Sequence, residues 1–159
     1  MRKLSMRILE LIGEGLGVQF NNELIKSQTL VVNHYPSSAN GKPAHCDPNL
    51  KTFIQQQVYG LEIFKGGHWI GDHPLPYAFV VNIFYQQEII SNNKLVAGEH
   101  HAITNPETAR TSIGTFAGPL GDCIVEPTKA LVNGGSPALF RAFKYHEFLD
   151  DYIAKKDPI

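Results

Sequence analysis

The chain has 159 residues, of which 43% are hydrophobic and 18% charged, and its formal net charge at pH 7 is -1. This length and composition are typical of one globular domain, and the single domain is expected to span residues 1–159. Acids and bases are mixed along the sequence, which argues against nucleic acid or an anionic membrane as a partner. The expected partner is a small molecule.

The first predicted element is an amphipathic helix over residues 2–16. Its apolar positions recur at helical spacing, at Leu4, Ile8, Leu11 and Ile12. Glycines at positions 15 and 17 are expected to end the helix. Two glutamates interrupt the apolar run and no small-residue cleavage site follows, so this segment does not read as a signal peptide. No stretch of the sequence is long and apolar enough to suggest a membrane span.

A β core is expected over about 28–126. Short runs rich in β-formers are separated by Gly, Pro, Asn or Asp, and they cover residues 29–35, 52–57, 61–64, 78–83 and 111–116. A series of short strands separated by turn-forming residues is typical of a sandwich or barrel. Gly66 and Gly67 predict a hairpin turn, whereas the prolines at 74 and 76 predict a loop or an edge.

The last predicted element is a helical tail over about 144–155, with one apolar face formed by Phe148, Leu149, Tyr152 and Ile153. Trp69 and most phenylalanines are expected in the core, and Lys51 and Lys65 are expected to be solvated. The two cysteines, Cys46 and Cys123, are far apart in sequence. They read as free thiols in a reducing compartment, which predicts a cytoplasmic location.

The residues that carry chemistry begin with His45 and Asp47. They are two positions apart, so on an extended segment both side chains face the same way and can bind one ion. Taken alone, the pair fits a loop or capping role better than a metal site. His100 or His101 could supply a third ligand, and on a strand only one of them could reach the metal. Two imidazoles and one carboxylate would form the facial set that holds non-haem Fe(II).

Arg110 and Ser112 are also two positions apart and share a face of a predicted strand. The guanidinium and the hydroxyl could then donate hydrogen bonds to the same organic carboxylate. Taken alone, Arg110 would be assigned to a surface salt bridge. Together with the facial set, the pair points to an oxygenase that uses an oxo acid as co-substrate.

Further short motifs occur in a fixed order along almost the whole chain: Asn33-His34-Tyr35-Pro36, His45-Cys46-Asp47-Pro48, Gly60-Leu61-Glu62-Ile63, Trp69, Ala78-Phe79-Val80-Val81-Asn82-Ile83, Ser91-Asn92, His100 and Arg110-Thr111-Ser112-Ile113. In these motifs the chain resembles the catalytic portion of the plant soluble 2-oxoglutarate and Fe(II)-dependent dioxygenases. The opening helix and the stretches 113–115 and 124–127 are most similar to the hyoscyamine 6-hydroxylase-like branch.

The resemblance implies a mainly β fold, a double-stranded β-helix of the cupin-like jelly-roll kind with an N-terminal and a C-terminal helix. It implies that Fe(II) is bound by His45, Asp47 and His100, because His100 has the family spacing to the arginine. The residues implied to bind 2-oxoglutarate are Arg110, Ser112, Tyr35 and Asn33. Phe116 matches a family position near the organic substrate, although a core aromatic role is as good an interpretation.

The implied activity is oxidation of a small specialised metabolite or hormone, with decarboxylation of 2-oxoglutarate to succinate. Dioxygen is the second co-substrate, and ascorbate is a candidate reductant. Family members carry a long region before the first helix, so the chain is expected to be N-terminally truncated. The exposed sheet face that would result favours self-association.

Two other functions stay open: an inactive homologue that acts only by binding, and a non-oxidative cupin-like metal protein. Cys46 and Phe84-Tyr85 depart from the family pattern. These departures put turnover and substrate access in question.

Overall fold

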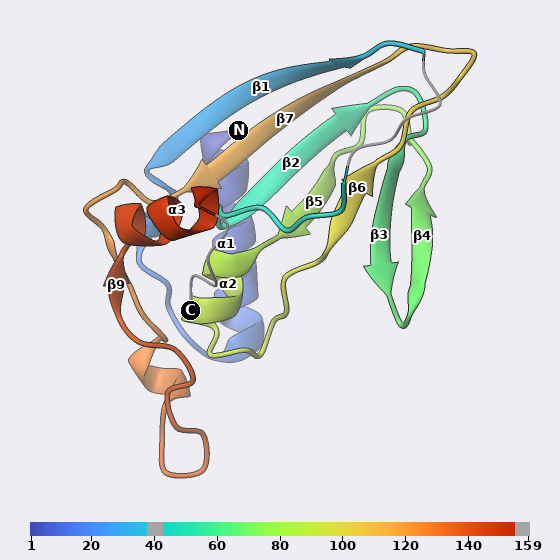
Figure 1. The fold of residues 1–159 in the computed structure, drawn as a ribbon. Helices are drawn as coiled ribbons and strands as arrows, with labels where there is room; N and C mark the ends of the chain where they lie inside the picture. Colours follow the sequence, from blue (N-terminus) through green and yellow to red (C-terminus); the bar gives the residue numbers. More distant parts are fainter. Residues whose placement is uncertain (38–42, 155–159) are drawn as a thin grey trace.

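Two antiparallel sheets form the body of the protein (Figure 1). The computed structural model describes residues 1–37 and 43–154, so residues 38–42 of the predicted β core and residue 155 of the predicted tail lie outside the described residues. In spatial order, the four-stranded sheet contains β1 (Ser27–Tyr35), β7 (Arg110–Gly118), β2 (Lys51–Gln56) and β5 (Val80–Ile83). The three-stranded sheet contains β4 (His68–Asp72), β3 (Leu61–Lys65) and β6 (His100–Ala102). This arrangement is a jelly roll, as predicted.

The register of the large sheet sets which side chains face the small sheet. Along β7 the residues at 110, 112 and 114 are buried while those at 111 and 113 are exposed, which is the alternation of a strand with one covered face. On one side Ser112 pairs with Asn33 of β1, and on the other side it pairs with Gln56 of β2. Side chains from three strands therefore meet in one row on the inner face.

The β3–β4 hairpin turns at the predicted glycines. Gly66 and Gly67 have φ angles of 61° and 83°, the left-handed conformation that a two-residue hairpin loop requires. The prolines at 74 and 76 follow the end of β4 and lie outside the strands. Both turn predictions are confirmed.

Helix α1 (Arg2–Leu16) lies behind the four-stranded sheet and ends at Gly17 in the left-handed conformation (Figure 1). Its buried positions are Ser5, Leu9 and Gly13, whereas Leu4 and Leu11 are exposed. Of the predicted apolar face, Ile8 and Ile12 are half-buried, so the prediction was wrong for Leu4 and Leu11 and the packed face is rotated from the predicted one. A Cβ at position 13 would lie 2.5 Å from the carbonyl oxygen of Val18, so close backbone approach selects small residues on the packed face.

The main core lies at the helical end of the large sheet. The remaining elements here are η1 (Asn22–Ile25), α2 (Tyr85–Ile90), β8 (Ile124–Val125), η2 (Lys129–Leu131), β9 (Phe143–Lys144) and α3 (Tyr145–Ile153). The buried cluster contains Leu9, Leu24, Ile25, Leu50, Ile89, Ile90, Ala117, Val125, Phe143, Tyr145 and Phe148. On α3, Phe148, Leu149 and Tyr152 pack as predicted, but Ile153 is exposed. Helix α2 was not predicted, because a six-residue helix depends on tertiary packing more than on local sequence.

Two side chains contradict their predicted environments. Lys51 is 0% exposed on the outer face of β2, where its Nζ donates a 3.2 Å hydrogen bond to the carbonyl oxygen of Ser5 in α1. Burial lowers the pKa of Lys51 to about 8. Trp69 is partly exposed and its ring stacks on that of His101 with centroids 3.9 Å apart. Lys65 is exposed, as predicted.

Part of the outer sheet face carries exposed apolar side chains, whereas Phe53 and Thr115 are buried on the same face. Exposed large hydrophobic side chains occur there at Leu30, Val32, Val81 and Ile113, and Phe79 is exposed next to them in sequence, just before β5. We call these five residues the outer patch. The flanking strands β1 and β5 each pair on one side only within the described sheet. In the described parts of the chain, no helix has the length and apolar character needed to cross a bilayer.

Candidate functional site

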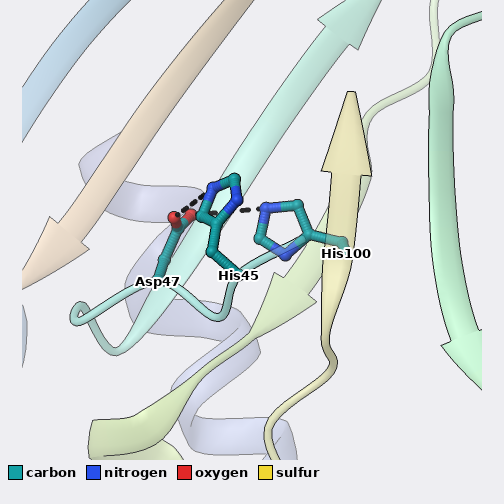
Figure 2. A group of neighbouring side chains, drawn as sticks. All are labelled: His45, Asp47 and His100. Atoms are coloured by element: carbon teal, nitrogen blue, oxygen red, sulfur yellow. Dashed lines mark ion pairs between the residues drawn. The ribbon is translucent and has the colours of Figure 1, made fainter. Parts of the chain in front are cut away.

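The three predicted metal ligands come together between the two sheets. His45 extends the small sheet, because its backbone exchanges two hydrogen bonds of 2.9 Å with His100 on β6. Residues paired in this way present their side chains on the same side, and the two rings have centroids 4.5 Å apart. Asp47, two residues further along, points to the same place (Figure 2).

The distances between the ligand atoms suit one metal ion. Nε2 of His45 lies 3.5 Å from Oδ1 of Asp47, and Nε2 of His100 lies 3.9 Å from Oδ2 of Asp47 (Figure 2). Two ligands at about 2.1 Å from a metal ion are at most about 4.2 Å apart. Both separations from Asp47 are below this limit, and the candidate ligand atoms of the three residues all lie within 4.8 Å of one another. Two imidazoles and one carboxylate are a donor set that fits Fe(II).

Both histidines are oriented to offer Nε2. Nδ1 of His45 is 3.1 Å from the carbonyl oxygen of Pro43, and Nδ1 of His100 is 3.3 Å from that of Gly98. A carbonyl oxygen can only accept, so Nδ1 carries the proton and Nε2 keeps its lone pair. Burial lowers the pKa of His100, and the nearby His45 acts in the same direction while Asp47 opposes it. The neutral imidazole that a metal requires is therefore favoured.

Two supporting residues were not recognised in the sequence. Thr52 on β2 donates a 3.2 Å hydrogen bond to Oδ2 of Asp47 and so fixes the carboxylate against the large sheet. Phe84, fully buried just before α2, places its ring 5.2 Å from that of His100. The alternation in the predicted strand 52–57 could have put Thr52 on the inner face. Nothing local links Phe84 to the histidine.

His101, the alternative third ligand, faces the opposite side of β6. Its Nε2 lies 2.6 Å from Oε2 of Glu62, and Oε1 of the same carboxylate accepts a 2.8 Å hydrogen bond from the hydroxyl of Tyr59. In the described ranges, the group of His45, Asp47 and His100 is the one set of three such side chains close enough to share an ion. Three other histidines have contacts elsewhere: His34 with Thr111, His73 with Tyr59, and His146 with the carbonyl oxygen of Gly121.

The predicted oxo-acid residues line the same cavity as the metal ligands. This cavity of about 80 Å³ is lined by Asn33, Tyr35, His45, Asp47, Ile54, Leu61, His100, Ala102, Arg110, Ser112, Gly114 and Phe116. Register explains the clustering, since Tyr35 pairs with Arg110 and Asn33 pairs with Ser112. All eight predicted site residues are therefore brought together by the fold.

Arg110 is 2% exposed and has no ion-pair partner among the described residues. The surface salt bridge considered for it from the sequence is therefore not what the structure shows. The Cζ atom of Arg110 lies 5.0 Å from the ring centroid of Tyr35. Its Nη1 is buried and has no hydrogen-bond partner among the described residues. Burial lowers the pKa of Arg110, and Tyr35 opposes this shift. A buried arginine with an unsatisfied donor fits an anionic ligand in this cavity.

Phe116 bends back over the sheet. A Cβ at Gly114 would lie 3.0 Å from Cε2 of Phe116, so the ring occupies the space that a side chain at 114 would fill. Phe116 thereby forms part of the cavity wall together with Ile54 and Leu61. Both the substrate contact and the wall role remain compatible with this placement.

Cys46 lies between two ligands, but its thiol is not activated. Burial raises the pKa of Cys46 to about 11, and Glu99 contributes in the same direction, so the thiol stays protonated at neutral pH. Its backbone carbonyl accepts a 2.8 Å hydrogen bond from the hydroxyl of Tyr152 on α3. The C-terminal helix therefore anchors the loop that carries His45 and Asp47.

Comparison with known proteins agrees with this geometry. Residues 26–119 match the family model described as the 2OG-Fe(II) oxygenase superfamily. The chain is 41% identical to hyoscyamine 6-dioxygenase of Hyoscyamus niger, covering 98% of this chain and 48% of that protein. It is 37% identical to 2'-deoxymugineic-acid 2'-dioxygenase of Hordeum vulgare, covering 98% and 49%. The chain thus spans about half the length of these relatives.

A solved structure shows the same fold. The crystal structure of JOX2 in complex with 2OG, Fe and JA superposes with a TM-score of 0.88 at 32% identity, covering 99% of this chain and 50% of that one. The family match extends over more than half of the chain and includes both the metal ligands and the buried arginine. The chain belongs to the 2OG-Fe(II) oxygenase superfamily.

Proposed function

We propose that this chain carries the site of a 2-oxoglutarate-dependent oxygenase, with Fe(II) held by His45, Asp47 and His100. The observation that carries the proposal is the position of Arg110. This arginine is buried, has an unsatisfied Nη1 and lines the cavity that the metal ligands also line. A carboxylate bound by Arg110 and a chelating oxo group at the metal are the two ends of one small oxo acid.

Different residues of the cavity bind 2-oxoglutarate and form the apolar wall. Arg110 and Ser112 bind the distal carboxylate of 2-oxoglutarate, with Tyr35 and Asn33 on the same inner face. When bound, Fe(II) couples dioxygen-driven decarboxylation of 2-oxoglutarate to succinate with oxidation of the organic substrate. The apolar wall formed by Ile54, Leu61 and Phe116 excludes water from this chemistry.

The organic substrate is a small specialised metabolite or hormone of a plant. Support comes from relatives that are named for hyoscyamine and 2'-deoxymugineic acid, and from the solved relative whose complex contains JA. Phe116 is the residue assigned to contact it. Dioxygen is the second co-substrate, ascorbate serves as reductant, and the site of action is the cytoplasm.

Self-association is part of the proposal. The outer patch and the edge strand β1 supply the apolar surface and the unpaired backbone groups that a second copy could cover. Light scattering after size exclusion tests this, and Val32→Lys with Ile113→Lys should restore the monomer. A wild-type chain that stays monomeric at all concentrations would contradict it.

Anaerobic titration of the purified chain with Fe(II) and 2-oxoglutarate tests the oxygenase site. The metal-to-ligand charge-transfer band should saturate, and Arg110→Ala should lose it while still binding Fe(II). Arg141→Ala is the matched control, since Arg141 is exposed and packs near Phe143 away from the cavity. Metal binding without any band would favour a binding-only homologue or a non-oxidative metal protein.

A further inference from the structure

We propose that Gln56 and Asp72 are positioning residues that orient Arg110 while leaving its positive charge for the distal carboxylate of the oxo acid. This inference rests on the proposed function, in which Arg110 binds 2-oxoglutarate. It concerns how the chain prepares the arginine before the ligand arrives. Gln56 and Asp72 themselves are not assigned a contact with the ligand.

Arg110 is held by neutral acceptors on one side only. Its Nη2 donates a 2.6 Å hydrogen bond to Oε1 of Gln56, and its Nε donates one of 3.3 Å to the carbonyl oxygen of Val58. Within the described residues Nη1 has no acceptor. The guanidinium is thus held by two hydrogen bonds and by the Tyr35 ring beside it, and Nη1 is available to a ligand in the cavity.

Asp72 fixes the orientation of the Gln56 amide. Nε2 of Gln56 donates a 2.8 Å hydrogen bond to Oδ2 of Asp72 and a 3.3 Å one to its backbone carbonyl oxygen. Both groups on Asp72 can only accept, so the amide nitrogen must face Asp72. Oε1 of Gln56 must then face Arg110. The carboxylate therefore acts on the arginine through the amide and not directly.

The identity of residue 56 determines whether the positive charge of Arg110 is available to the ligand or is neutralised by an ion pair. A carboxylate at this position would form a buried ion pair with Arg110 and would compete with an anionic ligand for the guanidinium. The neutral amide accepts one N–H and does not neutralise the cation. The negative charge lies instead on Asp72, which contacts Gln56 and not Arg110. Arg110 donates to Gln56 and Gln56 donates to Asp72, so both hydrogen bonds form without an ion pair at Arg110.

Exchanging the two functional groups tests this idea. The double variant Gln56→Glu with Asp72→Asn keeps the net charge and the side-chain volumes. It also keeps the hydrogen bond from Arg110 to residue 56 and the side-chain bond between residues 56 and 72, because the new amide donates to the new carboxylate. Only the 3.3 Å bond to the backbone carbonyl oxygen of residue 72 is lost. The exchange moves the negative charge into contact with Arg110. The matched control is Gln55→Glu, since Gln55 lies on the same strand but is exposed on the outer face. The Kd of 2-oxoglutarate is measured anaerobically on each Fe(II)-loaded chain, together with the Kd of Fe(II) and the melting temperature.

The exchanged variant should bind 2-oxoglutarate at least about ten-fold more weakly, and Gln55→Glu should change the Kd less than about two-fold. Fe(II) affinity and melting temperature should be preserved in both. With 2-oxovalerate, which lacks the distal carboxylate, the exchanged variant should show no comparable loss. Equal Kd values for 2-oxoglutarate in the exchanged and control variants would overturn the inference alone. Failure of the unaltered chain to bind 2-oxoglutarate would overturn the proposed function and the inference with it.

Discussion

His100 and His101 are neighbours in sequence, yet their imidazoles lie on opposite faces of β6. Nε2 of His100 is 3.9 Å from Asp47 inside the jelly roll, while Nε2 of His101 is 2.6 Å from Glu62 on the other side. The alternation of side chains along a strand produces this separation. It makes the two residues a matched pair for testing the metal site.

His100→Ala should weaken Fe(II) binding by more than the roughly 100-fold that loss of an outer-shell partner can cost, since a ligand is removed. His101→Ala removes the 2.6 Å hydrogen bond with Glu62 but no ligand, so Fe(II) affinity should stay within a few-fold of the original. Calorimetric titration with Fe(II) under anaerobic conditions measures both. Comparable losses in the two variants would contradict the assignment of His100.

Thr52→Val should weaken Fe(II) binding about ten-fold, because the hydrogen bond that orients Asp47 is lost while shape is kept. Thr111→Val serves as control, since its hydroxyl contacts His34 on the exposed outer face. The Kd of Fe(II) is measured for both variants and compared with that of the unaltered chain. An unchanged affinity in Thr52→Val would mean that Asp47 is held by other contacts.

Gly60→Ala should abolish 2-oxoglutarate binding. A Cβ at position 60 would lie 2.5 Å from Cδ of Arg110 and 2.8 Å from the carbonyl oxygen of Ile103, so the arginine must move. Crowding of this kind typically costs about 1–3 kcal/mol of stability as well. Gly15→Ala, with open space around its Cβ, is the control. Retained 2-oxoglutarate affinity in a folded Gly60→Ala chain would show that Arg110 tolerates displacement.

Lys51→Met should stabilise the fold at pH 7 by about 1–3 kcal/mol, since a buried cation is replaced by an apolar side chain of similar length. The pKa of Lys51 in the folded chain is about 8, below its ordinary value of 10.5. Between these values the unfolded chain holds a proton that the folded chain has released, so this group makes the free energy of unfolding rise with pH. Below pH 8 both states are protonated and the cost of burial is fully present.

The stability difference between Lys51→Met and the unaltered chain should therefore shrink as the pH rises from 8 to 10.5. Urea unfolding at pH 7 and pH 10 measures it. Lys65→Met, at an exposed position, should show no such trend. A difference that stays constant across this range would show that Lys51 keeps an ordinary pKa in the folded chain.

The sequence by itself determined the class of fold and the residues that meet at the site. Strand-like runs with period-two alternation place Arg110 and Ser112 on one face. Gly66 and Gly67 predict a hairpin, because glycine adopts the left-handed conformation of a two-residue turn without steric cost. Motif order and spacing supplied the family resemblance. These features are local, so a linear reading can detect them.

Only the tertiary structure decided which long-range contacts prepare these residues. The pairing of β2 with β7 places Gln56 beside Ser112 and within hydrogen-bond distance of Arg110, and the approach of α1 to the sheet buries Lys51. Strand register and helix packing depend on the combined burial of many side chains distant in sequence. For that reason the ligands could be named from the sequence, while their supporting residues became visible only in the folded chain. Thr52 and Phe84 contact the ligands, Gln56 contacts the arginine, and Asp72 contacts Gln56.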